Sequence, residues 1–297
     1  MSFLFAPGPM PVLPVEGEAN LYFPIHRIYG VARNYAAVNV ALGEKTPPSI
    51  FLKPADAAVY AAADKTLELD FPCATKDLQH EIELVVAIGK AGKNIPVEEA
   101  MDYVWGYAAG LDLTRRDLQR AAGAKGQPWA TAKAFDESAP MTAVKPASRT
   151  PDNEPMKVWL YVNNEKRQEG TTAEMILNTA EIISYLSTLY ELKPGDLIMT
   201  GTPAGIGTIH PGDVLEGGVG NGLGAAHPRD LVAVLHRAQA HHDAIGLHEG
   251  LLRVGFGERL LQAAALSQRD AVLDAQKRID RPGAPVAPPL GSELRMG

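Results

Sequence analysis

The sequence predicts a β-rich α+β fold, because strand-like segments outnumber helical ones along most of the chain. Apolar runs with the length and composition of strands cover residues 50–53, 82–88, 104–113, 158–162 and 197–200. Helical periodicity is clear only over 97–103, 114–122 and 179–189. In the last of these, Ile182, Ile183, Leu186 and Leu189 recur at helical spacing, which is typical of a helix packed on a core.

The composition is that of a globular protein. Of the 297 residues, 46% are hydrophobic and 21% charged, so the chain can bury a sizeable core. The net charge of −7 and a pI near 5.6 argue against nucleic acid or an anionic membrane as a partner. A single cysteine, Cys73, fits a reducing compartment. The chain has no signal-peptide pattern and no apolar run of about 18 residues, so we expect a cytoplasmic protein.

Two carboxylates, Glu81 and Glu83, stand two residues apart at the start of the strand-like run 82–88. Residues i and i+2 of a strand face the same side, so both acids should point the same way. Like charges that close are unfavourable unless a divalent cation compensates them. The alternative is an exposed strand with a solvated acidic face, but the five apolar residues that follow Glu83 indicate a buried strand.

A third acid, Asp112, ends the apolar segment 107–111 and precedes the basic pair Arg115 and Arg116. An Asp at the end of a strand suits a hard cation with oxygen ligands. Three carboxylates with several waters would hold Mg²⁺ or Mn²⁺. The spacing alone does not decide between a metal site and a solvated acidic surface.

Nine segments, in order, resemble the fumarylacetoacetate hydrolase family over nearly two thirds of the chain. Together they are far more specific than any one alone, and they lie closest to the fumarylpyruvate hydrolase branch, which cleaves acylpyruvates. The matching segments are Arg33-Asn34-Tyr35-Ala36, Phe51-Leu52-Lys53-Pro54, His80-Glu81-Ile82-Glu83, Gly106-Tyr107 through Asp112, Thr114-Arg115-Arg116-Asp117, Gly126-Gln127-Pro128-Trp129, Ala132-Lys133-Ala134-Phe135, Arg167-Gln168-Glu169-Gly170 and Gly201-Thr202-Pro203-Ala204-Gly205-Ile206-Gly207.

The resemblance implies a mixed β-roll of curved sheets with short helices, assembled as a homodimer. It implies an Mg²⁺ or Mn²⁺ ion held by Glu81, Glu83 and Asp112. It also implies that catalysis depends on three donors that stabilise negative charge on the substrate, Arg116, Gln119 and Lys133. Such charge develops because cleavage of a C–C bond beside a ketone passes through an alkoxide and an enolate.

Substrate binding falls, by the same resemblance, to Arg33, Tyr35, Gly201 and Thr202. The turn at 201–203 would offer backbone N–H groups and the Thr202 hydroxyl to a substrate carboxylate. Without the resemblance, this segment would be interpreted as an ordinary tight turn after the strand 197–200.

One departure from the family pattern concerns the general base. Active members carry a His and a Glu, three residues apart, on a short lid helix just after the Arg-Asn-Tyr-Ala motif. Here these positions hold Val38 and Ala41, and neither side chain can move a proton. A missing general base costs roughly 10²–10⁴ in rate. Glu44 is a possible substitute, although it also fits a solvated loop charge.

The pattern divides the chain into a Pro-rich surface arm (1–24), a catalytic domain (25–220) and an atypical C-terminal extension (221–297). Up to residue 221 there are 12 Lys and 7 Arg, whereas the rest has 1 Lys and 8 Arg. A shifted reading frame through GC-rich coding sequence would give this composition and would remove the last strand of the domain. The competing interpretation is a genuine extension, because 257–279 has partial helical amphipathicity.

Three functions remain compatible with the sequence. The first is a metal-dependent hydrolase of fumarylpyruvate-like 2,4-dioxo acids. The second uses the same metal site for isomerisation or decarboxylation of 2-oxo acids, reactions that demand less of a water-activating base. The third is a catalytically impaired relic or a metal-dependent 2-oxo-acid binding protein.

Overall fold

The computed structural model describes residues 3–6, 8–35, 47–60, 65–150, 155–220 and 231–237. They belong to one compact unit that ends at Ala238. The strands in chain order are β1 (Val12–Pro14), β2 (Tyr22–Pro24), β3 (Arg27–Ala32), β4 (Ser49–Lys53), β5 (Ala58–Val59), β6 (Leu67–Asp70), β7 (Leu78–His80), β8 (Ile82–Ile88), β9 (Val104–Leu111), β10 (Thr114–Arg115), β11 (Ala139–Pro140), β12 (Lys145–Pro146), β13 (Lys157–Val162), β14 (Glu165–Thr171), β15 (Asp196–Met199), β16 (Gly207–Ile209), β17 (Val214–Val219) and β18 (Leu231–His236).

Helices are few and short, which confirms the predicted β-rich α+β class. They are α1 (Arg116–Ala124), α2 (Ala130–Lys133) and α3 (Thr179–Leu189), with 3-10 turns η1 (Ala55–Ala57), η2 (Val97–Tyr103), η3 (Ala147–Arg149) and η4 (Thr172–Glu174). Asn178 and Glu181 form a capping box at the start of α3. None of the helices in the described part of the chain has the length and apolarity of a membrane span.

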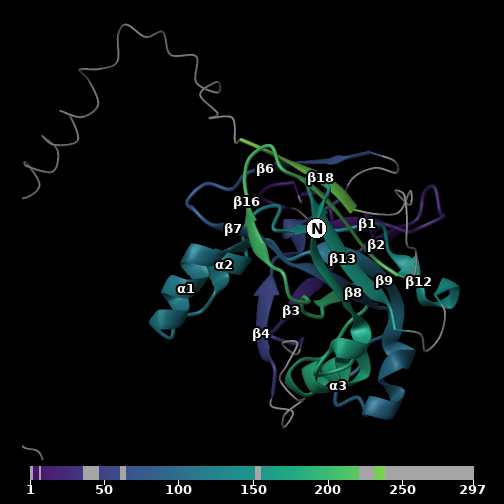
Figure 1. Ribbon diagram of the computed structural model, residues 1–297. Helices are drawn as coiled ribbons and strands as arrows, with labels where there is room; N and C mark the ends of the chain where they lie inside the picture. Colours follow the sequence, from purple (N-terminus) through teal and green to yellow (C-terminus); the bar gives the residue numbers. More distant parts are fainter. Residues whose placement is uncertain are drawn as a thin grey trace, which may run out of the picture. The chain divides into compact units, whose positions relative to one another are not determined.

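Two large sheets form the framework. One has six strands in the order β12-β9-β8-β15-β3-β4, and the other has five in the order β14-β13-β17-β18-β6. A small third sheet, β10-β7-β16, lies next to the segment that carries Glu81. In Figure 1, α1 and α2 lie together on one side of the sheets, while α3 lies apart from them. The central strands β8 and β15 are buried at every position, as expected of strands whose sheet is covered on both faces.

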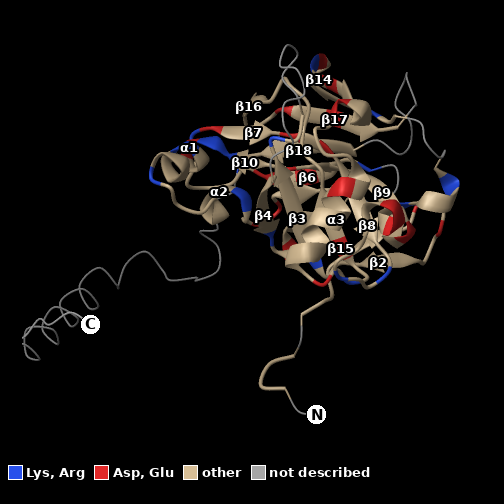
Figure 2. Ribbon diagram, turned by 90° about the horizontal axis from the view of Figure 1, so that it is seen from below, with Lys and Arg blue, Asp and Glu red and all other residues tan. Residues whose placement is uncertain are grey.

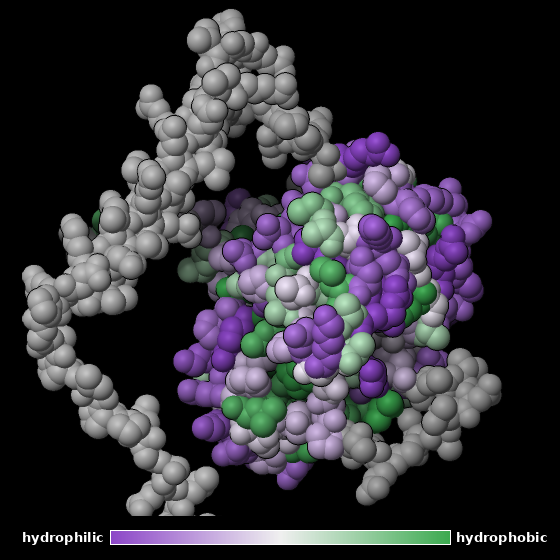
Figure 3. Space-filling view, turned by 90° about the vertical axis from the view of Figure 1, so that its left-hand side faces the viewer, coloured by the Kyte–Doolittle hydropathy of each residue, from purple (hydrophilic) through white to green (hydrophobic). Residues whose placement is uncertain are grey.

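The sheets bury three apolar clusters. Strand β8 is buried along its whole length, so its side chains serve clusters on both of its faces. Figure 2 shows basic and acidic residues interspersed over the described elements, and Figure 3 shows hydrophobic patches between hydrophilic ones on the face it presents.

Two expectations about the ends of the domain are wrong. The first 24 residues are more than a surface arm, because β1 pairs with β2 and the side chains of Leu13 and Phe23 are buried in the core. The domain also keeps a closing strand: β18 pairs antiparallel with β17 and parallel with β6. Its Leu231 and Leu235 side chains are buried. The predicted boundary at 221 lies outside the described residues.

Candidate active site

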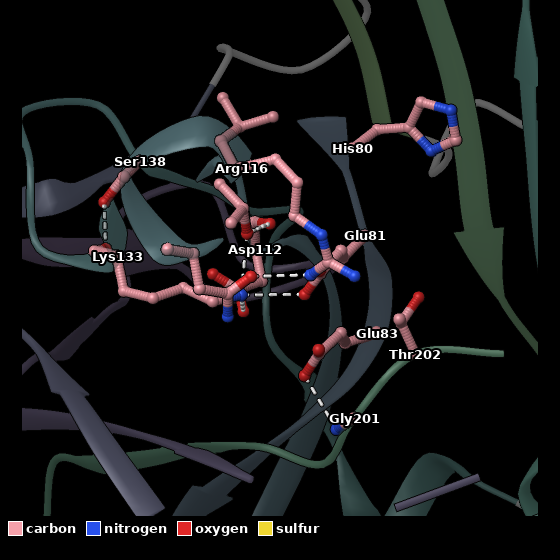
Figure 4. Close-up of polar contacts among 12 residues, drawn as sticks. His80, Glu81, Glu83, Asp112, Arg116, Lys133, Ser138, Gly201 and Thr202 are labelled. Carbon is pink, nitrogen blue, oxygen red and sulfur yellow. Dashed lines mark hydrogen bonds and ion pairs between the residues drawn. The ribbon is translucent and has the colours of Figure 1, made fainter. Parts of the chain in front are cut away.

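The three predicted carboxylates meet inside the fold, where antiparallel pairing of β8 with β9 sets Ile82 opposite Leu111. The Asp112 N–H donates to the Glu81 carbonyl at 2.8 Å, which fixes these neighbours side by side. Glu81 lies in the break between β7 and β8, not within a strand as expected. Ligand atoms of Glu81, Glu83 and Asp112 all lie within 4.8 Å of one another, and all three residues are buried (Figure 4).

Two buried lysines flank this carboxylate cluster. Lys133 Nζ, from α2, donates to Glu81 Oε2 at 2.7 Å, to Thr114 Oγ1 at 2.6 Å and to Asp112 Oδ2. Lys53 Nζ, at the end of β4, lies 2.9 Å from Asp112 Oδ1, an ion pair whose alignment falls short of a hydrogen bond. Its hydrogen bonds go to three backbone carbonyls, those of Leu113, Lys133 and Ser138.

Two further predicted residues line up at the edge of the cluster. Arg116 Nη1 lies 3.4 Å from Glu81 Oε1 and donates to Gln119 Oε1 at 2.6 Å. Both come from α1, which begins immediately after β10 and so directs its first turn at the carboxylates. The structure thus brings all six predicted metal-binding and catalytic residues together.

The charges of this cluster are unevenly matched. Burial favours the neutral form of Asp112, but Lys133 and Lys53 outweigh it and lower the pKa of that carboxyl. Burial, with the charges of Asp112 and Glu81, raises the pKa of Glu83 well above its ordinary value. The only hydrogen bond to its carboxylate within the described structure is the Gly201 N–H, at 2.7 Å from Oε2. Glu83 is therefore a buried acid without a cationic partner.

Burial and neighbouring charges also set the pKa values of the other acid and of the two lysines. Burial raises the pKa of Glu81, and Lys133 offsets this only in part. Burial opposes the charged form of Lys133, but Asp112 and Glu81 raise its pKa. Burial lowers the pKa of Lys53, which Asp112 offsets only partly. The most strongly paired charges are thus Asp112 and Lys133.

These residues fit a divalent cation. All of the candidate ligand atoms are oxygens, the type that Mg²⁺ and Mn²⁺ prefer. The acidic triad includes a carboxylate, Glu83, that forms no ion pair among the described residues and whose buried charge Lys133 offsets only in part. An ion at this position would supply the missing positive charge.

The four predicted substrate-binding residues differ in their surroundings. Tyr35 has a buried hydroxyl without a hydrogen-bond partner among the described residues, and burial together with the Glu83 charge raises its pKa. Gly201 adopts a φ of 98°, a left-handed conformation suited to glycine, and its N–H is used by Glu83. The Thr202 hydroxyl donates to the Ile82 carbonyl at 2.7 Å. Arg33 is exposed and has no hydrogen bond to the carboxylates within the described structure.

Sequence reasoning assigned no role to two residues that belong to the site. Lys53 could have been noticed as a lone cation at the end of a strand-like apolar run, and it is the one residue of β4 that is fully buried. Gln168 binds the turn at 201–203 through side-chain hydrogen bonds, for which the sequence carries no signal beyond its place in a family motif. Val38, Ala41 and Glu44 lie outside the described residues.

The family model described as "Fumarylacetoacetate (FAA) hydrolase C-terminal" matches residues 27–230. The chain belongs to the fumarylacetoacetate hydrolase family. This confirms the resemblance drawn from the motifs, and the matched region includes all the residues of the carboxylate cluster.

Among curated proteins of the fumarylacetoacetate hydrolase family, the mitochondrial oxaloacetate tautomerase FAHD1 of Mus musculus is 45% identical over 181 residues, which are 60% of this chain and 80% of that protein. The mitochondrial oxaloacetate tautomerase FAHD2 of Oryza sativa subsp. japonica is 41% identical over 186 residues, 62% of this chain and 81% of that protein.

Among solved structures of the family, the fumarylpyruvate hydrolase from Pseudomonas aeruginosa in complex with Mn²⁺ and pyruvate is 44% identical. It has a TM-score of 0.73 and covers 80% of this chain and 100% of that chain. This likeness confirms the fold that the family resemblance implied.

Proposed function

We propose that this protein is a divalent-metal-dependent enzyme that converts a 2-oxo acid through its enolate, and that enol–keto tautomerisation is the reaction its site supports best. The observation that carries the proposal is the buried carboxylate cluster, in which Glu83 lacks a cationic partner while Lys133 and Arg116 stand beside Glu81. Such a site gathers positive charge where an enolate would form.

The proposed metal ligands are Glu81, Glu83 and Asp112. A bound Mg²⁺ or Mn²⁺ would chelate the 2-oxo acid and accept part of the enolate charge. The relative from Pseudomonas aeruginosa was solved with Mn²⁺ and pyruvate, a 2-oxo acid, which supports this assignment.

The chain's own donors would do the rest. Lys133 and Arg116 are cations beside the cluster and would stabilise the enolate oxygen, with Gln119 held in place by Arg116. Tyr35 is neutral at ordinary pH, and burial raises its pKa further, so its hydroxyl can donate a hydrogen bond to a bound acid. Because these groups are mostly buried, little water competes with them.

Tautomerisation needs only a proton moved from C3 of the keto acid to the oxygen on C2, or the reverse. Hydrolysis must also activate a water molecule, and the side chains of Val38 and Ala41 cannot accept its proton. The two curated relatives named above are oxaloacetate tautomerases. These facts favour tautomerisation of a small 2-oxo dicarboxylic acid such as oxaloacetate.

Hydrolysis of an acylpyruvate is the second candidate. The observation that favours it is the likeness to the fumarylpyruvate hydrolase, whose whole chain is covered at 44% identity. In this reaction water would add to the distal ketone, and the C–C bond would break to give a carboxylic acid and pyruvate enolate.

The two candidates are separated by parallel assays with Mg²⁺ and with Mn²⁺. Conversion of enol-oxaloacetate to the keto form is followed by the loss of its ultraviolet absorbance, and decarboxylation by the pyruvate formed. Fumarylpyruvate cleavage is followed by the pyruvate and fumarate formed. Metal-dependent tautomerisation that far exceeds fumarylpyruvate cleavage is expected. Fast cleavage would overturn the order of the two candidates, and oxalate binding without any turnover would indicate a relic.

We also expect a homodimer, as members of this family are commonly oligomeric. Large apolar side chains remain exposed on neighbouring elements, among them Met101 of η2 and Leu189 of α3. Light scattering after size exclusion tests this, and a monomer at micromolar concentration would contradict it.

A further inference from the structure

Gln168 of β14 is a buried amide that joins two parts of the site. Its Oε1 lies 3.2 Å from the Ile82 backbone nitrogen and 2.8 Å from His80 Nδ1. Its Nε2 lies 2.7 Å from Thr202 Oγ1 and 2.9 Å from the Pro203 carbonyl oxygen. The amide therefore connects the strand that carries Glu83 to the turn at 201–203.

Donor and acceptor roles in this network follow from its backbone partners. The Ile82 N–H can only donate, so the atom facing it must be the amide oxygen; the Pro203 carbonyl can only accept, so it faces the amide nitrogen. His80 then donates to the amide oxygen from Nδ1. Thr202 Oγ1 accepts from Gln168 and must donate its one proton to the Ile82 carbonyl.

The turn therefore keeps one unused hydrogen-bond donor for a ligand. The Gly201 N–H is used by Glu83, the Thr202 hydroxyl proton by Ile82, and Pro203 has no N–H. Within the described structure, the Thr202 backbone N–H has no acceptor. Figure 4 shows Thr202 and Gly201 beside Glu83, while the His80 side chain points away from the carboxylates.

The backbone of β14 also packs directly on this turn. A Cβ atom on Gly205 would lie 2.0 Å from the Arg167 carbonyl oxygen, and one on Gly170 would lie 2.7 Å from Pro203 Cβ. Gln168 stands between these two close approaches along the strand. Its side chain and its strand together thus contact Thr202, Pro203 and Gly205.

We propose that Gln168 is a positioning residue: it fixes Thr202 and the turn at 201–203 so that the Thr202 backbone N–H is presented to the carboxylate of a 2-oxo acid. The inference rests on the proposed function for its ligand, but the network itself does not depend on a metal. It also changes the role expected of the Thr202 hydroxyl, which holds the turn instead of touching the substrate.

A double-mutant cycle tests this role. Gln168→Met keeps the length of the side chain but removes its hydrogen bonds, and Thr202→Val removes the hydroxyl but keeps the side-chain shape. The dissociation constant of oxalate is measured by calorimetry at saturating Mg²⁺. Each variant should weaken oxalate binding about tenfold, which is the effect of losing one hydrogen bond. The double variant should bind oxalate little more weakly than either single variant, because both changes break the same network. Thr202→Ser should restore near-native binding. Additive losses, or unchanged binding in Gln168→Met, would overturn the proposal.

Two further measurements separate positioning from general loss of stability. Ser187→Ala removes a buried hydroxyl that accepts from the Ile95 N–H, outside the carboxylate cluster, and should lower the melting temperature without changing oxalate binding. Hydrogen exchange of the metal-free protein should speed up at the Gly201 amide, the one hydrogen-bonded N–H of the turn, in Gln168→Met but not in Ser187→Ala.

The exchange result stands whether or not the wild type binds oxalate, so failure of the proposed function and failure of this role are distinguishable. Equal exchange of the turn in wild type and Gln168→Met would refute the role. If Gln168→Met does not fold, Gln168→Glu replaces it, because a carboxylate facing the Pro203 carbonyl must also release the turn.

Discussion

Replacing Glu83 with Gln should raise the stability of the metal-free protein while weakening its metal binding. Glu83 is a fully buried acid whose pKa is raised by burial and by the charges of Asp112 and Glu81. The neutral amide removes that repulsion and can still accept from the Gly201 N–H. The same change removes one of three carboxylate ligands, so the two effects should have opposite signs.

The geometry sets the magnitude. Two charges 4.8 Å apart repel by about 3.5 kcal/mol at an effective dielectric constant of about 20. Proton uptake by Glu83 relieves part of this at about 1.4 kcal/mol per unit of pKa shift. We therefore expect metal-free Glu83→Gln to be about 1–3 kcal/mol more stable than wild type near pH 8.

The sign of the pH dependence follows from linkage. Because the folded pKa of Glu83 lies above the ordinary 4.5, the folded state binds a proton that the unfolded state releases. The corresponding stability is present below about pH 4.5 and is lost as the pH rises through the folded pKa. The advantage of Glu83→Gln should grow over this window, since the amide does not titrate.

Urea unfolding in EDTA at several pH values measures the first effect, and calorimetry with Mg²⁺ the second. Glu81→Gln is the matched control: it also removes a proposed ligand, but Glu81 is paired with Lys133 and Arg116, so any gain in the stability of the metal-free protein should be smaller than that of Glu83→Gln. Both variants should lose on the order of 100-fold or more in Mg²⁺ affinity. A less stable Glu83→Gln in EDTA, or unchanged Mg²⁺ affinity, would refute the reasoning.

Three other outcomes are expected. Lys53→Met leaves Asp112 with one cation fewer and removes the hydrogen bonds to the Leu113, Lys133 and Ser138 carbonyls, so it should cost about 3–5 kcal/mol in urea unfolding; a loss below about 1 kcal/mol would contradict this. Val38→His with Ala41→Glu should raise kcat for fumarylpyruvate cleavage more than it changes KM, and fast native cleavage would point to another base. A chain ended after residue 220 lacks β18, whose Leu231 and Leu235 are buried, and should be at least about 3 kcal/mol less stable than one ended after residue 238; equal stability of the two would contradict this.

Much of the site could be predicted because its residues stand at the ends of long apolar runs. The runs before Asp112 and after Glu83 become β9 and β8, and their pairing brings the acids together. What could not be predicted is how the charges are shared. Two lysines pair with Asp112 and none with Glu83, which depends on where α2 and β4 place their last residues.

The ends of the domain were harder to predict for different reasons. The strands β1 and β2 could not be predicted because the first 24 residues are rich in proline, and because strands of three residues are too short to show a periodicity. Leu231–His236 is an apolar run with the length of a strand, but it lies in a segment whose composition differs from that of the chain before residue 221. Its buried Leu231 and Leu235 alternate with partly exposed Val232 and Val234, the pattern of an ordinary strand.

The uneven pairing in the cluster links folding to metal binding. Asp112 has a lysine at each oxygen, and Glu81 is flanked by Lys133 and Arg116. Among the described residues, the Glu83 carboxylate is bonded to a peptide N–H alone, and a buried carboxylate held by one neutral donor destabilises the fold. A cation at the cluster would convert this unfavourable charge into a ligand, so stability and metal affinity should rise together with added Mg²⁺. Glu83, rather than the better-paired Asp112, is therefore where the metal dependence of stability should concentrate.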